Sequence, residues 1–410
     1  NAEVFRRLDR GAPQLVDVVP AQSAIPVLRE GKTLLHCGPP IEIERTADPL
    51  RRSMRAAACA EGWAADPEEA DRLLATGEIR IESANVHGVV VPMATSMGPT
   101  TPMWVIDLAE AGIRTHAPIG QGSGDVAWFG KDSPGAIDRL VLLREVAGPV
   151  LAEAVRAHGP IDVMSLAAQA VAMGDDVHVR TQAATNLLLR TLLPSLVRSE
   201  HPRRGEAATF LSSNYLLFLT LAMAAARSLT TWAAQVEGSS VVVGMARNGT
   251  DFAAWLPGPD PTWHVTSAPP VGRALYQPGF SAEDAAPDIG DSAVLELVGL
   301  GGACAAGSPA VAQIVGGTMA HAAELTEALD NVCVGNSSRF TIPVWGMKGS
   351  PVGVDVRRVV ELGITPSVTT GILHVSDGTG QVGAGVAEAP LQPFVDALLE
   401  LDAKLSQESR

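Results

Sequence analysis

The chain has 410 residues, of which 46% are hydrophobic, with 40 glycines, 29 prolines and a net charge of −15. This composition is typical of a folded, turn-rich protein with room for two or three domains, and it excludes intrinsic disorder. The acidic balance argues against nucleic acid and against an anionic membrane surface as main partners, because both need a basic footprint.

The four cysteines also limit the classes of protein to which the chain can belong. Cys37, Cys59, Cys304 and Cys333 form no Cys-x-x-Cys pair and fit no zinc framework. No secretory signal pattern opens the sequence, so we expect a cytoplasmic protein with reduced thiols. The apolar stretch at 215–226 is too short to span a bilayer and predicts a buried core helix.

Strand-like and helix-like segments alternate over residues 1–160. Asp66, Pro67 and Glu69 give one of the helices an N-cap, a first-turn proline and a capping-box-like pattern. The predicted strands are 15–19, 32–37, 80–93 and 103–109, and the predicted helices are 48–63, 66–77 and 133–159, the last with a possible break near Gly148-Pro149. This alternation predicts an N-terminal α/β domain that ends near residue 160.

The rest of the chain divides into two further parts. Residues 161–236 carry Ala and Leu at helical spacing and predict a helical subdomain. Residues 237–410 return to alternation and end in a helix from about 391, which predicts a second α/β domain. Residues 257–290 are rich in Pro and Gly without periodicity, and we interpret them as an ordered, packed loop. The predicted fold is therefore mixed α/β: two α/β domains with a helical middle subdomain.

A predicted hairpin carries two charges that its turn does not need. Asn248-Gly249 lies between two apolar runs, which is a strong hairpin signal. Arg247 and Asp251 flank this turn. They could be a solvated tip, or they could be presented into a cleft. In the second case we expect both side chains to be partly buried and close to His178 or to the helix that follows Gly316-Gly317.

Two glycine-rich segments are candidate anion sites. The Gly-x-Gly-x-x-Gly pattern that begins at Gly378 leads into a strand rather than a helix, so a dinucleotide site is disfavoured. Gly316-Gly317 precede a helix and could expose backbone N–H groups to an anion. A simple tight connection explains the two glycines equally well. Lys348 lies in a third Gly-rich turn and could hold an anion, although an exposed lysine is the default interpretation.

Histidines and acids supply candidates for proton transfer. His178 follows Asp175-Asp176 and precedes Arg180, while His87 and His374 end predicted strands. A structural role is the better expectation for any one of these histidines. No pair has metal-ligand spacing, so no metal site is indicated. The acidic residues Glu283, Asp284, Asp288, Asp291 and Glu296 could be solvated, or could steer an amine or a divalent ion.

Seven stretches together resemble the family of oxamate carbamoyltransferase subunits known as AllG or YlbE-like. They are HCGPPIEIER (36–45), EGWAADPEEA (61–70), MGDDVHVRTQAAT (173–185), EGSSVVVGMARNGTDF (237–252), 268–302, 352–372 and GQVGAGVAEAP (380–390). The resemblance implies carbamoyl transfer between carbamoyl phosphate and oxamate, with oxalurate as the carbamoylated product, alongside two other subunits. The chain departs from the family pattern at Val179, Thr181 and Val375, where the substrate could differ.

Small anionic substrates need cations and N–H donors. We therefore expect Arg247 and Asn248 to bind anion and oxyanion, with Asp251 as their orienter, and His178 with Asp175 or Asp176 to act as acid or base. The remaining expected site residues are Arg180, His87, His374, Glu296, Gly316, Gly317 and Lys348. We expect no cofactor. We expect the chain to form a homo-oligomer and to work with partner subunits. Two alternatives stay open: a non-catalytic partner subunit, and a hydrolase of a ureido or cyclic amide substrate.

Overall fold

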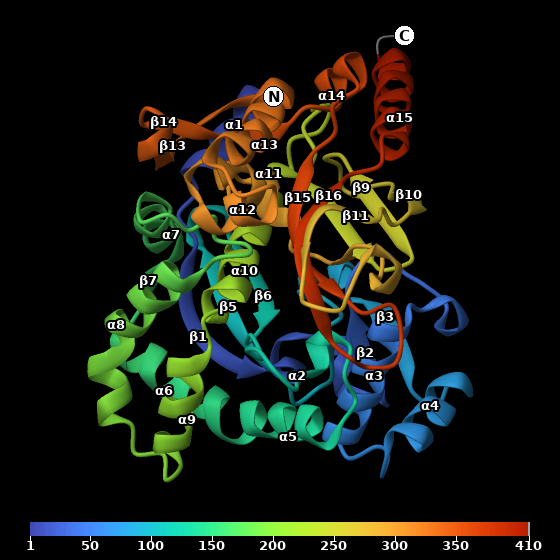
Figure 1. Cartoon of the computed structure of the whole chain (residues 1–410), viewed down its shortest axis with the longest axis vertical. Helices are drawn as coiled ribbons and strands as arrows, with labels where there is room; N and C mark the ends of the chain where they lie inside the picture. The colour runs from blue at the N-terminus through green and yellow to red at the C-terminus, as the bar shows by residue number, and fades with distance from the viewer. Residues whose placement is uncertain (409–410) are drawn as a thin grey trace.

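The computed structural model describes residues 1–408, and its fold is mixed α/β, as predicted (Figure 1). Small sheets rather than one continuous sheet carry the strands. The helices pack around these sheets and between them. The helices of the N-terminal part are α1 (Ala2–Arg10), α2 (Ala21–Ala24), α3 (Asp48–Ala60), α4 (Pro67–Ala75), α5 (Pro134–Leu142) and α6 (Gly148–His158).

Two sheets belong to the N-terminal part. The first has the order β6-β5-β1-β7, and each neighbouring pair is antiparallel. The second has the order β3-β2-β4, with β2 and β3 parallel. The strands are β1 (Gln14–Pro20), β2 (Thr33–His36), β3 (Arg80–Ser83), β4 (Ser96–Met97), β5 (Pro102–Leu108), β6 (Ile113–Pro118) and β7 (Ile161–Asp162).

The start of α4 shows how local sequence sets an element. Asp66 accepts a hydrogen bond from the backbone N–H of Glu69 at 2.8 Å, and the Glu69 side chain accepts one from the N–H of Ala65 at 2.7 Å. Pro67 occupies the first helical position, where its missing N–H costs nothing. The predicted N-terminus is confirmed.

The middle of the chain is helical, as predicted. Its helices are α7 (Val163–Ala172), α8 (Gln182–Arg198), α9 (Arg204–Ser213) and α10 (Leu217–Ala233). Helix α10 packs against β5 and β6 and is buried along most of its length, which confirms the predicted core helix. Among residues 1–408 no single helix is long and apolar enough to cross a bilayer, although α9 and α10, bent by 80°, pass that test as a pair.

The C-terminal part holds three sheets. Their orders are β10-β9-β8-β12, β11-β16-β15 and β13-β14. The strands are β8 (Gly244–Asn248), β9 (Asp251–Trp255), β10 (His264–Ser267), β11 (Val271–Tyr276), β12 (Ile289–Gly290), β13 (Cys333–Ile342), β14 (Lys348–Val354), β15 (Ser367–Leu373) and β16 (Gln381–Glu388). The helices are α11 (Val294–Leu297), α12 (Pro309–Ile314), α13 (Met319–Val332), α14 (Val356–Leu362) and α15 (Gln392–Glu408).

Some predicted boundaries are wrong. Residues 257–290 are not one loop, because β10, β11 and β12 lie within them. The prolines and glycines between these short strands hid their alternation. The strand predicted at 80–93 ends at Ser83, where a 3-10 turn begins. By contrast, the break predicted near Gly148-Pro149 in the 133–159 helix is present, as a π-helical turn at 143–147 just before these two residues.

The largest core cluster joins all three predicted parts of the chain. It contains Leu15 of β1, Phe218 of α10 and Val352 of β14, and each of these side chains is fully buried. Helix α10 therefore lies between the N-terminal and C-terminal sheets. The chain segments that precede and follow the helical part meet around it, and the candidate site lies at this junction.

Candidate functional site

The predicted β8–β9 hairpin is present, and Arg247 points into the protein. The strands pair in antiparallel register with Arg247 opposite Phe252, and Gly249 has the positive φ of +83° that the turn requires. The Arg247 side chain is 0% exposed. The Asp251 side chain is 10% exposed, so the part of the expectation that concerns burial is met for both residues and the hairpin is not a solvated tip.

Arg247 is held by Asp288 in a bidentate ion pair. The guanidinium donates from Nε at 2.7 Å and from Nη2 at 3.1 Å, while Nη1 has no hydrogen-bond partner among the described residues. Asp288 also accepts from the Thr370 hydroxyl at 3.0 Å. Burial disfavours the charge, but the attraction of Asp288 raises the pKa of Arg247 above its usual value. Asp288, rather than Asp251, orients this arginine.

Asn248 and Asp251 build the hairpin itself. The Asn248 side-chain oxygen accepts from the backbone N–H groups of Thr250 and Asp251, at 3.0 and 2.7 Å, and its amide donates to the Pro39 carbonyl. Asp251 accepts from Arg45 at 2.8 Å. All these groups are used in fixing the turn against the 38–45 segment.

His178 pairs with Glu296 at the centre of the junction. The distance from Nδ1 of His178 to Oε1 of Glu296 is 2.8 Å, and both side chains are buried. The carboxylate also accepts from the backbone N–H of Gly302 at 3.1 Å. In the tautomer that donates from Nδ1 to this carboxylate, Nε2 is left as an acceptor. Among the described residues, Nε2 of His178 has no hydrogen-bond partner.

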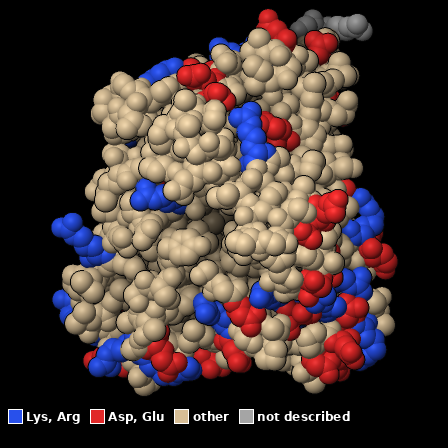
Figure 2. Space-filling view, viewed as in Figure 1, with Lys and Arg blue, Asp and Glu red and all other residues tan. Residues whose placement is uncertain are grey.

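A small cavity of about 70 Å³ opens beside His178, which is room for about two water molecules. It is walled mainly by aromatic and aliphatic side chains, and its polar side chains include Ser292, Gln381, His178 and Tyr215. Figure 2 shows that this face of the molecule is hollowed near its middle, where uncharged residues predominate. The lining residues are Pro92, Met93, Trp128, Phe129, His178, Val179, Tyr215, Leu216, Leu219, Ser292, Gly371, Gln381 and Ala384.

Two non-glycine residues at the cavity have left-handed backbone. Val177 has φ +62° and precedes His178, and Met93 has φ +49° and lines the cavity. A β-branched residue rarely adopts this conformation, which costs of order 1–3 kcal/mol. The backbone N–H of Val177 donates to the Arg180 carbonyl at 3.0 Å and helps to hold the turn. Such strain is typical of functional sites.

Asp175 and Asp176 support the His178 loop. Asp176 accepts from the backbone N–H groups of Val179 and Arg180. Asp175 accepts from the N–H of Ala184 in the first turn of α8. Burial raises the pKa of both carboxyls, that of Asp175 to about 6. Glu296, not either aspartate, is the hydrogen-bond partner of His178.

Asp291 ties the N-terminal part to this centre. It accepts from the backbone N–H groups of Gly38 at 2.7 Å and Val91 at 2.9 Å. Burial raises the pKa of this carboxyl to about 6. Arg227 of α10 is half-buried, and the loss of solvent around its guanidinium lowers the pKa of that group, which Asp291 opposes. Asp288 and Asp291 are therefore engaged by the protein itself.

Several sequence-predicted residues lie away from the cavity. His87 bonds Glu82, and His374 packs edge-on against Phe280. Lys348 bonds Asp330 and lies over the ring of Trp345. Gly316 and Gly317 are exposed, before α13. Arg180 is partly exposed and pairs with Asp175 at 3.4 Å.

The sequence does not predict every residue of the cavity. Ser292, Gln381 and Trp128 line it but belong to no recognisable motif. Asp288 was noted in an acidic cluster, but its pairing with Arg247 could not be read from spacing. Among the described residues no group of three or more His, Cys, Asp or Glu side chains could hold a metal ion.

Comparisons with known proteins identify the family of this chain. A family model described as oxamate carbamoyltransferase subunit AllG matches residues 79–292. The chain is 37% identical over 402 residues to oxamate carbamoyltransferase subunit AllG of Escherichia coli (strain K12), covering 97% of this chain and 96% of that protein. It is 32% identical over 401 residues to the uncharacterized protein YahG of the same strain, covering 97% and 84%.

A solved structure is also similar. The crystal structure of a conserved protein of unknown function from Enterococcus faecalis V583 matches with a TM-score of 0.94 at 32% identity, covering 98% of this chain and 97% of that chain. The fold therefore extends over nearly the whole length of both proteins. Together with the family model and the identity to the E. coli subunit, this shows that the chain belongs to the AllG family of oxamate carbamoyltransferase subunits.

Proposed function

We propose that the protein is a subunit of a carbamoyltransferase that moves a carbamoyl group between carbamoyl phosphate and oxamate, with oxalurate as the carbamoylated product. We further propose that it contributes a general acid–base histidine to the reaction site. The single observation that carries this proposal is the buried His178–Glu296 pair at the wall of a small cavity. Family membership supports the reaction class.

The proposed step uses His178 as follows. The amide nitrogen of oxamate attacks the carbonyl carbon of carbamoyl phosphate, a C–N bond forms, and the C–O bond to phosphate breaks. The attacking nitrogen gives up one proton, which Nε2 of His178 accepts, because Glu296 already holds Nδ1. In the reverse direction the imidazolium returns that proton. General acid–base catalysis of this kind contributes about 10²–10⁴-fold.

One feature supports a site shared with another subunit. Both substrates are anions, yet no Lys or Arg is among the described residues that line the cavity. Arg247 is engaged by Asp288, and Arg180 is turned toward Asp175. A partner subunit would then supply the cations that hold phosphate and carboxylate. The same observation favours a second candidate function, a partner that completes another subunit's site without catalysing the reaction itself.

The test is oxalurate cleavage by the reconstituted assembly, measured with and without this chain. We expect turnover that requires both inorganic phosphate and this chain. Turnover without phosphate would identify a hydrolase instead. Full turnover in the absence of this chain would contradict the proposal.

A further inference from the structure

The helices α8 and α9 form a hairpin whose two ends meet at the cavity. His178 and Val179, which line the cavity, come just before α8, and Tyr215 and Leu216, which also line it, come just after α9. The carbonyl of Tyr215 accepts from the Thr181 hydroxyl at 2.7 Å and from the Thr185 hydroxyl at 3.1 Å. These two hydrogen bonds join the start of α8 to the segment after α9 at the cavity wall.

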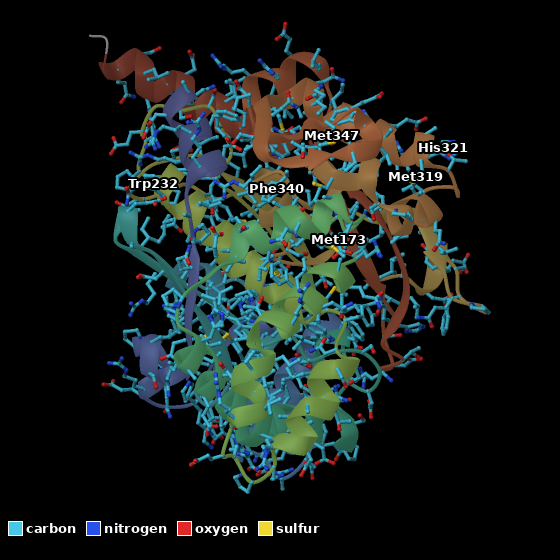
Figure 3. The ribbon with its side chains drawn as sticks, turned by 90° about the vertical axis from the view of Figure 1, so that its left-hand side faces the viewer. Met173, Trp232, Met319, His321, Phe340 and Met347 are labelled. Atoms are coloured by element: carbon cyan, nitrogen blue, oxygen red, sulfur yellow. The ribbon has the colours of Figure 1, made fainter. Side chains whose placement is uncertain are left out.

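The outer part of the hairpin is apolar and open. A groove of about 470 Å³ runs between α8 and α9, with Val150 of α6 at its floor. Leu193 and Val197 of α8 are 56% and 70% exposed on its rim. In Figure 3 these green helices lie at the front of the lower half of the molecule. The remaining lining residues are Leu189, Leu196, Arg204, Gly205, Ala208, Leu211 and Ser212.

The two helices of the groove carry unpaired cations. Arg204 of α9 lines the groove directly, Arg190 lies one turn before Leu193 on α8, and Arg198 is the last residue of α8. None of these three guanidinium groups has an ion pair or side-chain hydrogen bond among the described residues, whereas Arg203 is paired with Glu206. In a chain of net charge −15, most of the described arginines pair with neighbouring carboxylates, so three unpaired arginines on the two helices that form this groove are distinctive.

We propose that this groove docks a partner subunit of the carbamoyltransferase through an apolar segment flanked by carboxylates. The occupant follows from charge complementarity: an apolar floor takes Leu- or Met-like side chains, and the three arginines take Asp or Glu. A second copy of the chain is the competing occupant, and a homodimer that depends on the groove is one outcome of the test below. The proposal rests on the proposed function for the existence of the partner, and it names the surface where that partner binds.

A partner bound in this groove would also affect the cavity beside His178. A partner that shifts α8 against α9 acts on the His178–Val179 wall at one end of the hairpin and on the Tyr215–Leu216 wall at the other. The hydrogen bonds from the Thr181 and Thr185 hydroxyls to the Tyr215 carbonyl join these two walls. Partner binding and cavity shape are therefore coupled through one element.

The test is binding of the partner subunits of the carbamoyltransferase, followed by analytical ultracentrifugation. We expect Leu193→Asp with Val197→Asp, and separately Arg190→Glu with Arg198→Glu and Arg204→Glu, to weaken the complex at least about tenfold. The wild-type complex should weaken as salt is raised, and the arginine variant should lose most of that salt dependence. Since all five positions are exposed or line the groove, circular dichroism should show an unchanged fold.

Matched controls use similar residues elsewhere. Arg10→Glu with Lys32→Glu removes unpaired cations outside the groove, and Leu362→Asp changes a leucine that is 50% exposed on α14. Both controls should bind like wild type. Wild-type affinity in the groove variants, no complex with the wild-type chain, or a homodimer that only the groove variants lose would each overturn the inference. A groove-dependent complex without carbamoyl transfer would leave it standing and overturn the proposed function.

Discussion

At the residue scale, the role inferred for Arg247 changes once its partner is known. Beside an Asn-Gly turn it suggested an anion-binding residue at a hairpin tip. The structure buries it completely and pairs it with Asp288, which accepts a further bond from Thr370. Because β8 and β12 lie side by side, residues 41 positions apart form this pair. The arginine stabilises the junction of the sheets, close to Glu296.

Removing one member of this pair will be costly. In Arg247→Met the carboxylate of Asp288 remains buried without its cation, and such uncompensated charges typically cost about 3–5 kcal/mol. Urea unfolding should show that loss in the free energy of unfolding, with much less in the double variant Arg247→Met, Asp288→Asn. Arg10→Met, at an exposed position, should unfold like wild type. Equal losses in the single and double variants would show that the pair itself does not matter.

His36 makes stability depend on pH. Burial lowers the pKa of this imidazole to about 4 from its ordinary value of 6.5. The unfolded chain therefore takes up a proton that the folded chain refuses, and stability is lost as the pH falls from 6.5 to 4. Asp291 opposes this trend, because burial raises the pKa of its carboxyl from 3.8 to about 6. Its contribution is present at low pH and is lost as the pH rises through that window.

His36→Gln should reduce the acid-side loss of stability by about 3 kcal/mol, taking about 1.4 kcal/mol for each unit of pKa. Urea unfolding at several pH values from 7 to 4 measures this slope, independently of any constant offset from the substitution. The exposed His158→Gln is the control and should keep the wild-type slope. A His36→Gln curve parallel to that of wild type would contradict the assigned protonation.

At the element scale, periodic and well-capped segments could be predicted from the sequence and irregular ones could not. The Asp66 cap, the buried α10 and the β8–β9 hairpin follow from local pattern, and each is present. The strands between 257 and 290 were missed because prolines and glycines separate them. The turn at His178 was unpredictable for another reason, since nothing local indicates that Val177 would adopt left-handed backbone.

The strain at Val177 can be measured by comparing two substitutions. Val177→Gly and Val177→Ala both lose the buried side chain, but only glycine adopts φ +62° without strain. We therefore expect the glycine variant to be more stable than the alanine variant by about 1 kcal/mol in urea unfolding, despite its larger chain entropy. The reverse order would mean that the turn is not strained.

At the scale of the whole molecule, the site exists only because distant segments meet around α10. His178 comes from the loop before α8, and Glu296 lies on α11. The cavity residues Ser292 and Gln381 come from the segment before α11 and from β16. The sequence contained His178 and Glu296 as separate candidates. Their contact, 118 residues apart, required the packed fold. The same packing explains why His87, His374 and Lys348, which were equally plausible in the sequence, lie elsewhere.

The central claim is that His178, held by Glu296, transfers a proton during carbamoyl transfer. The most direct measurement is the rate of phosphate-dependent oxalurate cleavage by the reconstituted assembly with His178→Gln, beside Glu296→Gln and the exposed control His158→Gln. We predict a loss of about 10²–10⁴-fold for His178→Gln, a smaller loss for Glu296→Gln, wild-type turnover for His158→Gln, and undiminished assembly throughout. Wild-type turnover by assembled His178→Gln would contradict the account and favour a non-catalytic subunit.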